Sequence, residues 1–167
     1  HPSGLKAQRL LLIGGGKQSE FNLARLREVA GTTVRSARNH QSRSVALYIR
    51  DALPGTEALR VSVEGALYGN YEPDVYKTRD KEEKDVEELI LTGETKVQAS
   101  EVERAILCGT TVGDATNLAR ALVNEPANVL TPTQFAKRAV DVGSPVGLEV
   151  QILEREQMEK LGMNLLL

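Results

Sequence analysis

Hydrophobic residues in the first half of the chain follow two spacings that alternate along the sequence. Short apolar runs of strand length occupy residues 8–13, 44–49 and 88–92, and the first of these runs leads into three consecutive glycines. Apolar residues at helical spacing occupy 19–39 and 57–68, between those runs. Because near-continuous apolar strands that alternate with helices are typical of parallel sheets, the pattern predicts a parallel α/β sheet.

A charged segment around Pro73, residues 71–88, separates this region from a longer helical pattern. Ser100 and Glu103 have the spacing of a capping box, in which each side chain binds the backbone N–H of the other residue. Apolar residues then continue at helical spacing to Val123, which predicts a helix of about 24 residues and about 36 Å. A helix of this length suits a strut between two domains.

The long helix is expected to end at Pro126, because proline lacks an N–H and disfavours a helical conformation in the residue before it. After a short extended link, Thr131 supplies an N-cap, with a proline at the first helical position and a glutamine at the third. A strand at 148–153 and a helix at 154–162 are then expected to begin another α/β unit.

Composition places the chain among ordinary globular proteins, with 41% hydrophobic residues, 26% charged residues and no Trp. No apolar run approaches the roughly 20 residues that span a bilayer, and the first residues do not resemble a signal peptide. The single Cys108 excludes an internal disulfide and favours the cytosol. Since the sequence has no initiator Met and ends abruptly, we expect it to be a piece of a longer protein.

Charge is unevenly distributed along the chain. Residues 1–50 carry nine Lys/Arg and two Asp/Glu, a net charge of +7, and residues 51–167 carry a net charge of −9. A basic end can bind nucleic acid, and Arg25, Arg35 and Arg38 are expected on the exposed face of the 19–39 helix. The alternative is a solvated face offset by acidic residues nearby, such as those of 80–88. We prefer this alternative because the basic stretch has no aromatic stacking platform.

A scan for chemistry-bearing residues yields no catalytic, metal or cofactor residue in this chain. The two histidines, His1 and His40, are far apart, and no metal-binding spacing of His or Cys occurs. The acidic residues at 80–88 alternate with lysines, which indicates a solvated face. Cys108 lies in the middle of a predicted helix and is interpreted as a packed thiol. Ser44 and Asp51 belong to no recognisable triad.

The glycine segment at residues 13–19, IGGGKQS, allows two interpretations. A strand, a glycine turn and a helix N-terminus can cradle a phosphate through free backbone N–H groups. However, the segment lacks the third glycine of the dinucleotide fingerprint and the spacing of a P-loop. A tight turn that allows close packing of helix and sheet is the preferred interpretation.

Several segments together resemble one enzyme family. Residues 116–139, TNLARALVNEPANVLTPTQFAKRA, resemble the hinge of the leucine (cytosol) aminopeptidase family, in which a linker helix ends in Asn-x-Pro-x-Asn and continues as Leu-Thr-Pro. Residues 5–17, 71–78 and 154–167 resemble family segments in the same order. The resemblance implies a macro-domain-like α/β domain at 1–95, a linker helix at 96–125 and the beginning of a catalytic domain at 126–167.

The resemblance further implies a cytoplasmic hexameric enzyme that removes amino-terminal residues from peptides with two divalent metal ions, Mn or Zn. In the family, the metal-binding and catalytic residues lie beyond the point that corresponds to residue 167, so this chain alone is expected to be inactive. Two alternatives come from other classes: a nucleotide- or ADP-ribose-binding module, and a DNA-binding accessory domain, since some family members bind DNA. No membrane partner is expected.

Overall fold

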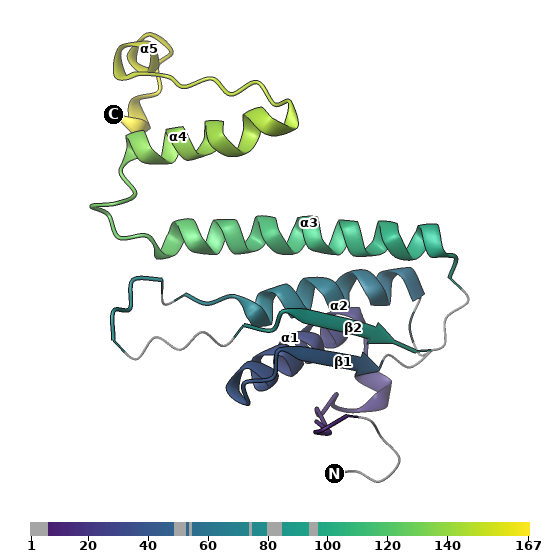
Figure 1. The fold of residues 1–167 in the computed structure, drawn as a ribbon. Coiled ribbons are helices and arrows are strands. Elements are labelled where there is room, and N and C mark those ends of the chain that lie inside the picture. The colour runs from purple at the N-terminus through teal and green to yellow at the C-terminus, as the bar shows by residue number, and fades with distance from the viewer. Residues whose placement is uncertain (1–6, 49–52, 54, 74, 80–84, 94–96) are drawn as a thin grey trace. The chain divides into compact units, whose positions relative to one another are not determined.

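The computed structural model describes residues 7–48, 53, 55–73, 75–79, 85–93 and 97–167. The chain divides into two compact units, His1–Ala121 and Leu122–Leu167, which are described separately (Figure 1). The first unit holds α1 (Leu23–Asn39), β1 (Ser44–Tyr48), α2 (Gly55–Asn70), β2 (Glu88–Thr92) and most of α3 (Ala99–Asn124). A short 3-10 turn, η1 (Gln18–Glu20), precedes α1.

The two strands pair in parallel, with Ser44 opposite Glu88 and Tyr48 opposite Thr92. The order β1, α2, β2 is therefore the parallel strand–helix–strand unit that the sequence predicted. Burial alternates along both strands, and Val45 and Leu89 pack against a cluster of Val34, Ala37, Ala66 and Val86. On the opposite face Tyr48 and Ile90 are exposed. Helices thus cover one face of the sheet in the part of the chain that the structure describes.

Helices α1 and α2 cross at very close range because glycines face each other at the crossing. A Cβ built at Gly31 would lie 2.9 Å from the carbonyl oxygen of Gly65. Built at Gly65 or Gly69, it would overlap the carbonyl oxygen of Arg27 or of Gly31. The close approach lets Leu26 of α1 pack with Ala58 and Val61 of α2 in a second buried cluster. Three partly buried residues pack against this cluster: Phe21, Leu23 and Leu53.

The strand expected at residues 8–13 is absent from the structure. These residues have no regular hydrogen bonding, and Leu12 is 84% exposed. A strand is stable only when a neighbour pairs with it, and the described sheet consists of β1 and β2. The helix expected at 19–39 also begins later, at Leu23, because the Asn22 side chain accepts the Arg25 N–H as its N-cap.

Helix α3 has 26 residues and begins before the expected capping box. Ser100 is already its second residue, and the Glu101 carboxylate accepts a bond from the backbone N–H of Gln98 at 3.3 Å. The expected pair of Ser100 and Glu103 is therefore wrong. Despite this length, no helix among the described residues is both long and apolar enough to cross a membrane.

The second unit holds α4 (Pro132–Gly143), α5 (Arg155–Lys160) and the 3-10 turns η2 (Ser144–Val146) and η3 (Asn164–Leu166). Thr131 caps α4 by accepting the Gln134 N–H at 3.3 Å, with Pro132 at the first position, so the predicted restart is confirmed. The link before it is a turn rather than an extended segment, since the Pro126 carbonyl accepts the N–H groups of Val129 and Leu130.

Residues 148–153, expected as a strand, have no regular structure, because no strand of the second unit's described residues lies beside them. The helix expected at 154–162 is present as α5, where Glu154 and Gln157 form a capping box. The macro-domain-like topology and the three domain ranges, 1–95, 96–125 and 126–167, stay predictions.

Candidate functional site at the seam between two helices

Across the described ranges, no group of three or more His, Cys, Asp and Glu could hold a metal ion. Cys108 is exposed, not packed as expected. Ser44 donates a hydrogen bond to the Glu88 carboxylate across the sheet at 2.6 Å. His1, Asp51 and most of 80–88 lie outside the described residues.

The glycine segment lies beside a hollow of about 230 Å³, whose lining includes Gly14 and Arg25. Arg25 is paired with Glu28 at 2.5 Å, so its charge is already offset. Gly16 has a φ of +80°, a left-handed conformation that glycine adopts without strain, but the next α-helix begins at Leu23 rather than directly after the glycines. The turn therefore does not place a helix N-terminus where a phosphate cradle needs one.

Several basic residues of positions 1–50 form ion pairs with acidic residues of positions 51–167. Arg38 is buried, not exposed as expected, because Glu72 at 2.6 Å and Asp85 at 3.7 Å bind its guanidinium. Arg43 pairs with Glu87 at 3.0 Å. Arg35 is exposed, as the helical pattern predicted.

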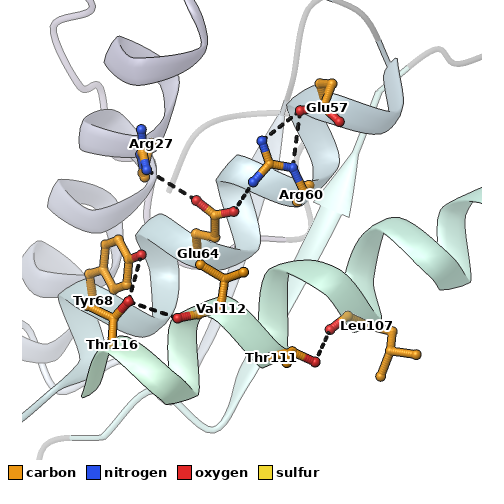
Figure 2. A network of polar contacts seen from close by, with 9 residues as sticks. All are labelled: Arg27, Glu57, Arg60, Glu64, Tyr68, Leu107, Thr111, Val112 and Thr116. Atoms are coloured by element: carbon orange, nitrogen blue, oxygen red, sulfur yellow. Dashed lines mark hydrogen bonds and ion pairs between the residues drawn. The ribbon is translucent and has the colours of Figure 1, made fainter. Parts of the chain in front are cut away.

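Helix α2 carries a buried carboxylate, Glu64, with 1% of its side chain exposed (Figure 2). Its two oxygens accept from two different arginines: Arg60, one turn earlier on α2, and Arg27 of α1, whose Nη1 is 3.3 Å away. A buried carboxylate is stable only when hydrogen-bonded cations compensate the water it has lost. No substrate can reach Glu64, so it joins α1 to α2 rather than taking part in chemistry.

Arg60 extends this network to the surface. It donates two hydrogen bonds to Glu57, from Nη2 at 2.6 Å and from Nε at 3.1 Å. These hydrogen bonds lower the pKa of the Glu57 carboxyl below its ordinary value and raise the pKa of Arg60. Charged forms of both residues are thus favoured in the folded state.

The other side of α2 packs against α3 along small residues. Ala105, Gly109 and Gly113 recur every fourth position and are the buried residues of α3. A Cβ built at Gly109 would lie 2.6 Å from the Arg60 carbonyl oxygen, and one at Gly113 would overlap the Leu67 side chain. The two helices can therefore lie this close only because these positions lack side chains.

Polar contacts near the end of α2 also join α2 to α3. Thr116 donates its hydroxyl proton to the Val112 carbonyl at 2.8 Å, so Tyr68 must be the donor in the 3.3 Å bond between the two hydroxyls (Figure 2). The Asn117 amide donates to the Leu67 carbonyl at 3.0 Å, and Arg120 donates to the Tyr68 carbonyl at 3.3 Å.

The residues that join α2 to α3 were not singled out by the sequence analysis, although the sequence contained one signal for a close contact. Gly65 and Gly69 on α2, and Gly109 and Gly113 on α3, each stand four residues apart inside a helix. Glycine inside a helix costs about 1 kcal/mol relative to alanine, so such pairs indicate a close helix contact. The partners of Asn117 and Arg120 had no local signal.

Two family models match the chain, and both describe the cytosol aminopeptidase family. The model of the family's N-terminal domain matches residues 1–80, and the model of its catalytic domain matches residues 117–167. The resemblance that residues 116–139 carried is thereby confirmed.

Curated relatives match over the whole chain. A probable cytosol aminopeptidase of Solibacter usitatus is 40% identical over 167 residues, which are 100% of this chain and 34% of the relative. A protein of the same name from Acidobacterium capsulatum is 36% identical over 97% of this chain and 32% of its own length. The chain spans about a third of the length of the curated relatives it matches.

Solved structures with the same fold include the bottromycin maturation enzyme BotP in complex with Mn. That structure is 30% identical, with a TM-score of 0.70, and the match covers 86% of this chain and 29% of that chain. A second structure of the same enzyme matches with a TM-score of 0.71 at 30% identity.

Proposed function

Since the chain belongs to the cytosol aminopeptidase family, we propose that it is the amino-terminal part of a metal-dependent enzyme that removes amino-terminal residues from peptides. The observation that carries the proposal is the order of the two family matches, 1–80 and 117–167, within a chain that is 40% identical to a named aminopeptidase along its entire length. The names of the relatives and the single cysteine support a place in the cytosol.

Two divalent ions, Mn or Zn, are the cofactors proposed for the complete enzyme. Such ions hold and activate the water that attacks the peptide bond and stabilise the developing charge. The residues described here do not fit this role, because they contain no group of three potential ligands. We therefore assign no catalytic step to the described residues, and we propose from the family resemblance that the metal ligands of the complete enzyme lie beyond residue 167.

For residues 1–167 themselves we propose a role in assembly or regulation. The supporting observation is the apolar surface of α3, where Leu107 is 67% exposed and Ile106 and Val112 are also exposed. Exposed apolar surface of this kind is typical of an interface. We propose that the complete protein forms a homo-oligomer, a hexamer, and light scattering of that protein tests the proposal. A monomer at micromolar concentration would contradict it.

The peptidase proposal is tested with the polypeptide extended to the length of its relatives. After removal of metal with a chelator, it is assayed on leucine p-nitroanilide with and without added Mn²⁺ or Zn²⁺. We expect turnover that depends on added metal. The proposal would be contradicted if neither Mn²⁺ nor Zn²⁺ supported turnover, or if the chelator did not reduce turnover.

The two alternative functions have less support. A nucleotide- or ADP-ribose-binding module would use the glycine turn, and the helix that follows begins only at Leu23. A DNA-binding domain would use the basic face of α1, and Arg38 is buried in ion pairs. Arg25 and Arg35 are the α1 arginines of that predicted face which remain exposed, and two contacts supply little of the electrostatic affinity that DNA binding needs.

A further inference from the structure

The carboxyl end of α2 needs partners from outside the helix. The last four carbonyl groups of an α-helix have no intrahelical N–H, and in α2 these belong to Leu67, Tyr68, Gly69 and Asn70. The residue after the helix is Tyr71, whereas the usual C-terminal cap has a glycine in the left-handed conformation. Two of the four carbonyls therefore depend on side chains supplied by another element.

Those side chains come from one turn of α3. The Asn117 amide donates to Leu67 at 3.0 Å, and the Arg120 guanidinium donates to Tyr68 at 3.3 Å. A cation at the carboxyl end of a helix also interacts favourably with the helix dipole. Asn117 and Arg120 thus act on α2 as a C-terminal cap that is contributed by a different helix.

Arg120 also fixes the geometry of this cap. Its Nη1 donates to the Asn117 Oδ1 at 3.0 Å, which leaves the amide nitrogen of Asn117 as the group that faces the Leu67 carbonyl. The guanidinium carbon lies 4.1 Å from the centre of the Tyr71 ring, within the range of a cation–π contact. One arginine therefore contacts the last turn of α2, the residue after it and its own partner on α3.

The position of these contacts along the chain gives them a consequence for the whole molecule. Leu67, Tyr68 and Tyr71 fall within the match to the family's N-terminal domain, and the match to the catalytic domain begins at Asn117. Arg120 also stands one residue before the end of the first compact unit, at Ala121. We propose that Asn117 and Arg120 form a latch that anchors the carboxyl half of α3 to the end of α2, and so joins the first residues of the catalytic-domain match to the N-terminal-domain match within the first unit.

Hydrogen–deuterium exchange of the purified protein tests the latch. In the double variant Asn117→Ala plus Arg120→Ala, amides of residues 67–71 and 116–121 should exchange about tenfold faster, since two hydrogen bonds of ordinary net strength shift an opening equilibrium by about that factor. Amides of α1 and of residues 57–63 should keep their wild-type rates, because Glu64 and the glycine crossing hold them independently. Arg104→Ala, which removes an exposed arginine of the same helix, is the matched control.

Two outcomes would overturn the latch. One is wild-type exchange in residues 67–71 and 116–121 of the double variant. The other is an equal rise over the whole first unit, which would indicate general destabilisation. If the double variant does not fold, Arg120→Lys is measured in its place. Lysine keeps the positive charge but lacks the planar guanidinium that donates to both the Tyr68 carbonyl oxygen and the Asn117 Oδ1. A local rise of about threefold is then expected, and rates equal to those of Arg104→Ala would overturn the proposal.

Discussion

Glu64 shows how a single residue can join two helices. Its buried carboxylate accepts from Arg60 of α2 and from Arg27 of α1, so both charges lose a partner when it is changed. The two arginines are 32% and 41% exposed, and water can compensate them in part. This partial exposure places the expected cost below that of breaking a fully buried ion pair.

We therefore expect Glu64→Gln to lower the free energy of unfolding by about 2 kcal/mol, the range of hydrogen bonds to charged groups. The measurement is the midpoint of urea denaturation at neutral pH. Glu57→Gln is the matched control, because it removes a half-exposed partner of the same Arg60 and should lower the free energy of unfolding less than Glu64→Gln does. Equal losses in the two variants would contradict the importance of burial.

The lowered pKa of Glu57 leads to a prediction of how the free energy of unfolding depends on pH. Hydrogen bonds from Arg60 lower the pKa of Glu57 from its ordinary value of 4.5, so the folded state favours the carboxylate. The stability it contributes is fully present above the unfolded pKa near 4.5 and is lost as the pH falls through the lower folded pKa. Wild type should thus be more stable than Glu57→Gln at pH 7, and the difference should vanish as the pH falls below the lowered folded pKa of Glu57. A difference that grows below pH 4 would contradict this assignment.

Arg38 marks what the sequence could not predict at the residue scale. Helical spacing predicted that Arg38, Arg25 and Arg35 share an exposed face, and Arg25 and Arg35 are indeed exposed. Arg38 is buried because Glu72 and Asp85 reach it from segments more than 30 positions away. Helical periodicity contains no information about such distant partners. The pairs of glycines inside α2 and α3, in contrast, were visible in the sequence.

At the scale of elements, local signals correctly predicted two features of the fold. The runs at 88–92 and 131–134 correspond to β2 and to the N-terminus of α4, because side-chain pattern and capping residues suffice to define them. The runs at 8–13 and 148–153 have equally apolar sequences but are not strands. A strand needs a neighbour in addition to its own pattern, and the described parts of both units provide none beside these residues.

Because α1 and α2 cross so closely, we expect a substitution at Gly69 to lower the free energy of unfolding. In Gly69→Ala the new Cβ would overlap the carbonyl oxygen of Gly31 and lie 2.9 Å from its carbonyl carbon, so the helices must separate. Overpacking of this kind costs about 3 kcal/mol, and the better helix propensity of alanine offsets about 1 kcal/mol of it. We expect a net loss of about 2 kcal/mol in urea denaturation. Gly14→Ala is the control, since no atom lies within 4 Å of its Cβ. A Gly69→Ala variant as stable as wild type would contradict the close crossing.

The N-terminus of α4 gives a prediction for the second unit. Thr131→Ala removes the hydroxyl that accepts the Gln134 N–H, which should destabilise that unit by about 0.5–2 kcal/mol. Thr133→Ala removes the same side chain two residues later, inside the helix, and should change stability little. Thermal melting followed by circular dichroism compares the two. If both variants melt at the wild-type temperature, the cap does not stabilise α4.

At the scale of the whole molecule, the chain consists of two compact units whose boundary at 121 and 122 falls near the carboxyl end of α3. The two family matches leave residues 81–116 between them, and this interval contains β2 and most of α3. The contacts between α2 and α3 lie within the first unit. Helix α3 is therefore held against α2 by close packing at Gly109 and Gly113 and by the polar contacts that follow, before the chain enters the second unit.

The last prediction concerns activity. Hydrolysis by two metal ions requires several carboxylate or other ligands in one cluster, and no group of three exists among the residues described here. We therefore expect the purified 167-residue chain to release no p-nitroaniline from leucine p-nitroanilide, with or without Mn²⁺ or Zn²⁺. The polypeptide extended to the length of its relatives, prepared in the same way, is the positive control. To exclude contaminating peptidases, any turnover is measured again with Glu64→Gln, which should reduce the folded fraction on mild heating. Metal-dependent turnover by the short chain that falls together with its folded fraction would contradict the prediction and would place a catalytic centre within residues 1–167.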